Sequence, residues 1–235
     1  MDCGFYEFST MKKVAILQSN YIPWKGYFDI IKKSDVFIFH DDLQYTKGDW
    51  RNRNKIKTPH GLEWLTIPCG TNEKRLICEV KLSDYKWQNQ HWLKIKENYS
   101  KAPFFKDYSL FFEEFYLAKK WDYLHEFNQT LIIQIAQELL KLKTSFDDSR
   151  NYYLSEKKAE RVLELLLKAK ATDYVSGPAA KDYLSEELLT SNGIKLHWMD
   201  YSNYVEYPQL QPPFEHNVTI LDLLFNTGPN ALNYF

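Results

Sequence analysis

The chain has 235 residues and a formal net charge of -1 at pH 7, so no global field attracts nucleic acid or a membrane surface. We therefore expect no nucleic-acid partner, and we expect any anion site to be local. Aromatic residues make up 17% of the chain, including 17 Tyr and 7 Trp. Two interpretations of this content stay open: an aromatic core, or a groove that stacks sugar or base rings.

The cysteines are Cys3, Cys69 and Cys78, an odd number without a metal-binding spacing. This pattern predicts neither disulfides nor a zinc site, and it favours a reducing, cytoplasmic compartment. No apolar run approaches the roughly 20 residues that span a bilayer, so we expect no membrane insertion. Residues 1–10 lack the features of a signal peptide and are interpreted as an extension before a single domain over 11–235.

The first patterned segments predict a β-α-β unit. Residues 14–17 and 35–39 are short apolar runs typical of buried parallel strands, and 26–33 between them fit a helix. Such a unit favours a parallel sheet with helices on its faces.

The rest of the chain extends this pattern. Apolar periodicity predicts helices at 87–99, 110–119, 122–142, 156–169, 182–190 and 217–226, the last with Asn217 as its N-cap. Further strands are expected at 64–68, 77–82, 144–146, 173–175 and 194–199. We predict an α/β fold: a mostly parallel Rossmann-like sheet with helices on both faces and a helical middle segment.

The turn after the first strand is the leading candidate site, because open α/β sheets hold ligands at such turns. It contains Gln18, Asn20, Tyr21, Trp24 and Gly26. Amide and phenol groups exchange hydrogen bonds without titrating usefully near neutral pH, so they position a substrate rather than attack it. The alternative is a tight turn in which Gly26 serves packing alone.

The second apolar run ends at His40-Asp41-Asp42, followed by Gln44. A carboxylate at this strand end points into the same crevice as the first turn. Asp41, His40 and His91 are the candidates for a general base, and the sequence does not choose among them. The alternative for the aspartates is a surface cap. No histidine spacing indicates a metal site.

Residues 49–57 carry the strongest charge pattern. In an extended chain four basic side chains share one face and two amides the other: Arg51, Arg53, Lys55 and Lys57 against Asn52 and Asn54. Arginine favours bidentate contacts to phosphate or carboxylate, which indicates an anion site bordered by Trp50. A solvated edge strand guarded by charge is the alternative.

Asp222 and Asn226 are four residues apart in the last predicted helix, so they share one face. They either line a pocket or bond to each other.

These motifs together resemble the WbqC-like family. The resemblance is carried by residues 18–28, 34–45 and 50–59, and later by 64–68, 176–177, 183–184, 207–209 and 219–228. The chain departs from the family pattern at Ser19, where Pro is usual. Membership implies a role in bacterial surface-polysaccharide (O-antigen) synthesis, as a transferase that adds glycine or another small acyl or amino-acid group to a nucleotide-linked amino sugar. No cofactor is evident.

The leading hypothesis distributes roles among these residues. The turn 18–26 would hold the sugar or diphosphate, Arg51 and Arg53 would neutralise phosphate, and Asp41 would act as base or orient the amine. Trp24 and Trp50 would stack a ring. The alternatives are a non-catalytic protein that binds sugar nucleotides or glycans, and a nucleotidyltransferase-like enzyme. The first unit distantly resembles the nucleotidyltransferase turn, although both histidines of its His-x-Gly-His motif are absent here.

Overall fold

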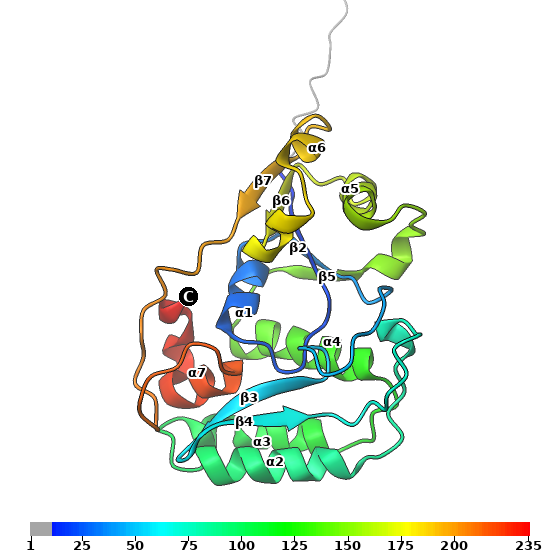
Figure 1. Cartoon of the computed structure of the whole chain (residues 1–235). Coiled ribbons are helices and arrows are strands. Elements are labelled where there is room, and N and C mark those ends of the chain that lie inside the picture. The colour runs from blue at the N-terminus through cyan, green and yellow to red at the C-terminus, as the bar shows by residue number, and fades with distance from the viewer. Residues whose placement is uncertain (1–10) are drawn as a thin grey trace, which may run out of the picture.

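The computed structural model describes residues 11–235, and its central element is a five-stranded parallel sheet (Figure 1). The strand order is β5-β2-β1-β6-β7. The bounds are β1 Lys13–Leu17, β2 Val36–Phe39, β5 Ser145–Asp148, β6 Asp173–Ser176 and β7 Lys195–Trp198. The predicted extension 1–10 and Cys3 lie outside the described residues, and Cys69 and Cys78 are free thiols.

Helices cover both faces of this sheet. Alternation along β1 sends Val14 and Ile16 to one face, where they pack with α5 (Lys158–Lys168) and α6 (Glu186–Thr190). Ala15 points to the other face, which is covered by α1 (Lys25–Lys32) and α4 (Leu124–Gln134). The predicted Rossmann-like α/β class is therefore confirmed, and the apolar runs of β1 and β2 reflect burial on two sides.

A separate antiparallel hairpin lies beside the helical middle segment (Figure 1). It consists of β3 (Arg53–Thr58) and β4 (Gly61–Thr66), with Lys55 opposite Trp64. It lies along α2 (Lys86–Tyr99) and α3 (Phe105–Leu117), and α7 (Ile220–Thr227) packs against the same region. The aromatic core here includes Trp92 and Phe105, whose rings are stacked 6.1 Å apart.

The strand predicted at 77–82 is wrong. Ile77–Glu79 form a 3-10 helix, and the backbone N–H of Leu82 donates to the carbonyl of Asp122. Ile77, Val80 and Leu82 are all buried. Ile77 and Val80 are three residues apart and lie on one side of a tight turn. Their apolar spacing therefore reflects burial against the core and not pairing with a neighbouring strand.

Two predicted helices begin later than expected. The helix predicted at 182–190 starts at Glu186, because Ser185 Oγ accepts from the backbone N–H of Leu188 and caps it there. The last helix starts at Ile220 with Thr219 as N-cap, so the assignment of Asn217 as N-cap is wrong. Within residues 11–235, no helix combines the length and apolarity needed to cross a bilayer.

Candidate functional site

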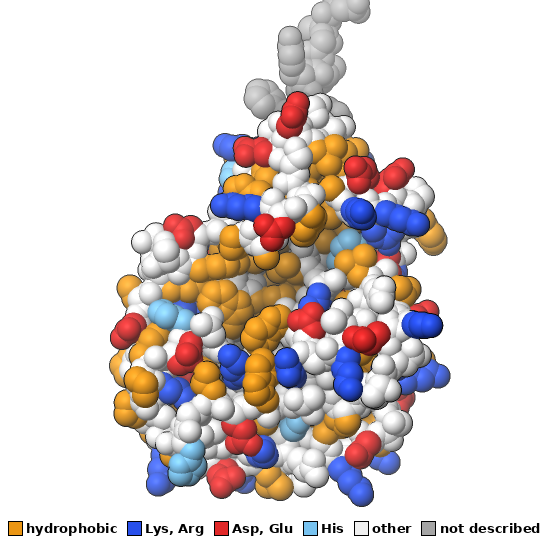
Figure 2. Space-filling model, viewed as in Figure 1, with side chains coloured by type: hydrophobic (Ala, Val, Ile, Leu, Met, Phe, Trp, Pro, Cys, Tyr) orange, Lys and Arg blue, Asp and Glu red, His pale blue; other side chains and the backbone are white. Residues whose placement is uncertain are grey.

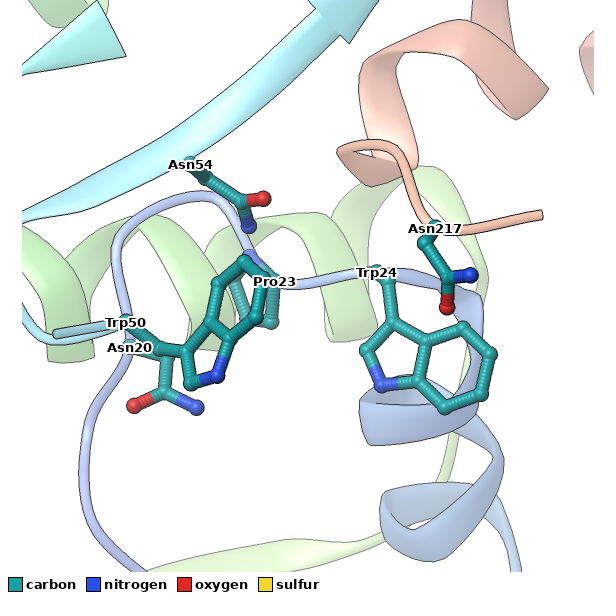
Figure 3. Close-up of a pocket in the computed structure, with 6 residues that line it drawn as sticks. All are labelled: Asn20, Pro23, Trp24, Trp50, Asn54 and Asn217. Atoms are coloured by element: carbon teal, nitrogen blue, oxygen red, sulfur yellow. The ribbon is translucent and has the colours of Figure 1, made fainter. Parts of the chain in front are cut away.

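A cavity of about 190 Å³ opens beside the turn that follows β1 (Figure 3). Its lining is Asn20, Pro23, Trp24, Trp50, Asn54 and Asn217. In Figure 3 the indole of Trp50 overlaps Pro23 in this view, and the indole of Trp24 lies to the right of both, beside Asn217. From the residues that the sequence indicated for substrate binding, the cavity brings together Asn20, Trp24, Trp50 and Asn54.

Backbone hydrogen bonds tie together the three segments that form the cavity. The N–H of Tyr21 donates to the carbonyl of Trp50 at 2.8 Å, which joins the turn to the start of the hairpin. The N–H of Ile220 donates to the carbonyl of Pro23 at 2.9 Å, so the start of α7 is fixed to the same turn. Backbone hydrogen bonds therefore hold segments that are far apart in the sequence in fixed positions around one cavity.

Asn54 holds the turn in an unusual conformation. Its Nδ2 donates to the carbonyls of Tyr21 at 3.1 Å and Ile22 at 2.8 Å. Ile22 has φ of 39°, a left-handed region that a β-branched residue rarely adopts and that costs on the order of 1–3 kcal/mol. Such strain persists only where neighbouring contacts fix the backbone, and the Asn54 amide supplies two of them.

Gly26 allows Trp24 to fold back over the start of α1. A Cβ at position 26 would lie 2.3 Å from Cζ2 of the Trp24 ring, so no larger residue fits while the ring keeps its place. The indole packs edge-on against Tyr201 at 5.0 Å between centroids and against Tyr204 at 5.9 Å. It is a fixed wall of the cavity.

The opposite wall is more open. The Trp50 side chain is 43% exposed and packs against Trp64 at 5.6 Å between centroids. Between the walls, Asn20 Oδ1 is buried and finds no hydrogen-bond partner among residues 11–235. Two ring faces with amide donors and acceptors suit a ligand that has apolar faces and a polar rim.

Asp41, the leading candidate for a base, does not line this cavity. Its Oδ1 accepts from the backbone N–H of Ser19 and its Oδ2 from Gln129 Nε2, both at 2.8 Å. Burial raises the pKa of Asp41, and the hydrogen bonds from Ser19 and Gln129 oppose that rise. The carboxyl group of Asp41 therefore stabilises the backbone of the turn without bordering the cavity.

The two candidate histidines are also buried outside the cavity. His40 Nε2 lies 3.2 Å from Arg161 Nε, and burial lowers the pKa of His40 to about 4. His91 Nδ1 lies 2.7 Å from the hydroxyl of Tyr21, and burial lowers the pKa of His91 to about 4 as well. Tyr21 also bonds to Tyr116 at 2.7 Å, so its hydroxyl is directed into the core.

The cavity residues belong to segments that a known family shares. A model of the WbqC-like protein family matches residues 18–234. The chain belongs to the WbqC-like family. The uncharacterized protein Rv1507c of Mycobacterium tuberculosis is 43% identical over 226 residues, covering 95% of this chain and 97% of the relative. No solved structure matches the chain.

Three further residues indicated by the sequence hold the backbone or lie on the surface of this WbqC-like protein. The carbonyl of Gln18 accepts from the Tyr27 hydroxyl at 2.9 Å. Asn52 Nδ2 donates to the carbonyl of Ile67 at 2.9 Å. Gln44 is exposed and forms a β-bridge with Leu76. None of these lines the cavity.

Asp222 and Asn226 form a buried network with the segment before α7. Asp222 accepts from the hydroxyls of Tyr99 at 3.1 Å and Tyr207 at 2.8 Å and from Gln209 Nε2 at 2.8 Å. Asn226 Nδ2 donates to the carbonyl of Asp222 at 2.7 Å. The sequence left open whether Asp222 and Asn226 line a pocket or bond to each other, and here they bond to each other.

Pro23 and Asn217 are the lining residues that the sequence interpretation did not select. Pro23 lies within the turn that the sequence indicated as a site, so its position in the chain could have identified it as a lining residue. Asn217 reaches the cavity only because α7 is fixed to the turn, and nothing local in its sequence marks it. No group of three or more His, Cys, Asp or Glu among the described residues could hold a metal ion.

Proposed function

We propose that this WbqC-like protein transfers glycine or another small acyl or amino-acid group to a nucleotide-linked amino sugar in surface-polysaccharide synthesis, and that the cavity between Trp24 and Trp50 receives the sugar. The observation that carries this proposal is the pairing of two indole walls with three amide side chains in one cavity. The C–H faces of a sugar ring pack on aromatic faces, while its hydroxyl and amino groups bond to amides.

The proposed transfer needs little from the protein beyond position. The sugar amine forms a C–N bond to the acyl carbon of an activated donor, the donor's leaving group departs with its electron pair, and the amine proton passes to that leaving group or to water, since the cavity lining has no titratable side chain. Amide N–H groups of Asn20 and Asn217 are available to stabilise the developing oxyanion, whereas that of Asn54 is engaged by the turn. Asp41 contributes by fixing the turn through Ser19.

The binding step is tested by thermal shift and calorimetry with UDP- and dTDP-amino sugars. We expect saturable binding that is lost in Trp50→Ala and kept in Tyr183→Ala, which removes an aromatic ring that is 58% exposed outside the cavity. Absence of binding to every amino sugar at millimolar concentration would refute the proposal.

A non-catalytic role in binding the same ligands is the second candidate. It is favoured by the cavity lining, which consists of asparagine, tryptophan and proline and contains no titratable side chain. Mass spectrometry of the sugar after incubation with activated acyl donors separates the two. An acylated product supports transfer, and binding without any product supports the accessory role.

A further inference from the structure

The basic side chains between Arg51 and Lys57 divide into two that are engaged and two that are free. Arg51 forms an ion pair with Asp49. Lys57 is buried and donates to Gln209 Oε1 at 2.6 Å and to the carbonyl of Pro213. Across residues 11–235, neither Arg53 nor Lys55 has a carboxylate partner, and Arg53 Nε is buried without any hydrogen-bond partner.

The two free cations share one indole. Arg53 Cζ lies 4.3 Å and Lys55 Nζ 5.0 Å from the centre of the Trp64 ring. The guanidinium also lies next to Gly48, where a Cβ would be at an ordinary van der Waals distance of 3.7 Å from Arg53 Cζ. Gly48 has φ of 69°, a conformation that favours glycine. The contact with Trp64 therefore places the guanidinium on the indole, while its buried Nε has no hydrogen-bond partner among residues 11–235.

Trp64 connects these cations to the cavity. Its ring packs against Trp50, and Trp50 is the open wall of the sugar cavity. Figure 2 shows basic side chains beside an apolar hollow in the middle of this face. Arg53, Lys55 and Trp64 do not line the cavity, so they form a neighbouring site on the side of Trp50 that packs against Trp64.

We propose that Arg53 and Lys55 form a diphosphate subsite, in which the guanidinium binds one phosphate and the ammonium the other while the sugar lies between Trp24 and Trp50. This assignment rests on the proposed function for the position of the sugar. Arginine binds phosphate through a planar pair of N–H donors, and lysine supplies a compact charge. The subsite recognises the diphosphate group of a sugar diphosphate. A nucleoside is one group that can be attached to the other end of that diphosphate.

The experiment measures binding of UDP, dTDP and inorganic pyrophosphate by calorimetry at low and high salt. The variants are Arg53→Gln and Lys55→Gln. Lys94→Gln is the matched control, because it removes a positive charge that pairs with Glu63 of the same hairpin. Far-ultraviolet circular dichroism and thermal unfolding confirm that each variant is folded.

We expect each subsite variant to weaken UDP binding on the order of tenfold, the loss of one charge-assisted contact, and to flatten its salt dependence. Lys94→Gln should bind like the wild type, and pyrophosphate should compete with UDP. The subsite is refuted if the two variants bind UDP as the wild type does, if Lys94→Gln loses as much, or if pyrophosphate fails to compete. Competition by pyrophosphate with equal affinity for UDP and dTDP assigns recognition to the diphosphate rather than to the nucleoside.

A free amino sugar separates this inference from the proposed function. Its binding should depend on Trp50 and be insensitive to Arg53→Gln. If the sugar binds and UDP does not, the sugar cavity stands and the subsite falls. If UDP binding depends on Arg53 and no sugar binds, the subsite stands and the proposed function falls.

Discussion

Lys25 offers a direct test of the electrostatics beneath the cavity. Its residue surface is 2% exposed at the start of α1, and its Nζ donates to the carbonyl of Val205 at 3.2 Å. The ammonium lies 4.7 Å from the Tyr204 ring centre and 5.4 Å from that of Tyr207, and no carboxylate among the described residues pairs with it. Burial lowers the pKa of Lys25 from 10.5 to about 8.

This lowered pKa sets both the sign and the size of a stability effect. The unfolded chain binds the proton more tightly, so stability is lost as pH falls from about 10.5 to 8 and the loss stays constant below that. At about 1.4 kcal/mol per pKa unit, the penalty at pH 7 is about 3 kcal/mol. Replacing Lys25 by Met removes the penalty and gives up one hydrogen bond, worth about 1 kcal/mol, and the contacts with the Tyr204 and Tyr207 rings, worth about 1 kcal/mol together. We expect a net gain in unfolding free energy of about 1 kcal/mol at pH 7.

The assay is urea unfolding of wild type and Lys25→Met at pH 7 and pH 10, followed by circular dichroism. The gain should shrink to about zero at pH 10, because the folded-state amine is then neutral and the remaining penalty of about 1 kcal/mol is offset by the hydrogen bond that Met cannot form. Lys32→Met, at an exposed position on the same helix, should change stability by less than about 0.5 kcal/mol at either pH. A Lys25→Met difference that does not change with pH would refute the reasoning.

Three other changes follow from contacts around the turn. Gly26→Ala would place a methyl group 2.3 Å from the Trp24 ring, so the affinity for amino sugars should fall about tenfold (about 1.4 kcal/mol), and unchanged affinity in calorimetry would contradict this. Asp41→Asn leaves the Gln129 N–H without its acceptor, so urea unfolding should show a loss of about 1–3 kcal/mol, whereas wild-type stability would count against that role. Burial lowers the pKa of His91 from 6.5 to about 4, so the unfolded chain binds the proton first and stability falls as pH drops through this window. His91→Gln should make the unfolding free energy less dependent on pH there, and an identical pH profile would show that His91 is not responsible.

The sheet was predictable because its strands are buried on both faces. In β1 and β2 that burial gives short unbroken apolar runs, and a helix between them requires a parallel pairing. The same rule failed at 77–82, where apolar spacing arises from a 3-10 helix against the core. Hydrophobic pattern reports burial, and burial does not by itself specify a hydrogen-bonded ladder.

The site was predictable only in part, because a sequence pattern indicates which side chains share a face of a strand but not which groups they contact. Asn52 and Asn54 alternate on one face and are equally buried at 4% exposure. Asn52 bonds to the carbonyl of Ile67, whereas Asn54 bonds to the turn and borders the cavity. Asn217 contributes through the docking of α7, a tertiary contact that leaves no local signal.

The contacts around the turn also explain how binding and folding can be separated experimentally. The strained Ile22 is held by Asn54, while Ser19 is held by Asp41 and Asn128 bonds to the carbonyl of Arg51. These supports come from β3, the end of β2 and α4, so the turn adopts its shape only when those elements have assembled, and changing a support perturbs the fold as well as the site. Trp50 differs because its side chain is 43% exposed and supports no strained backbone, so removing its ring should affect the ligand far more than the fold.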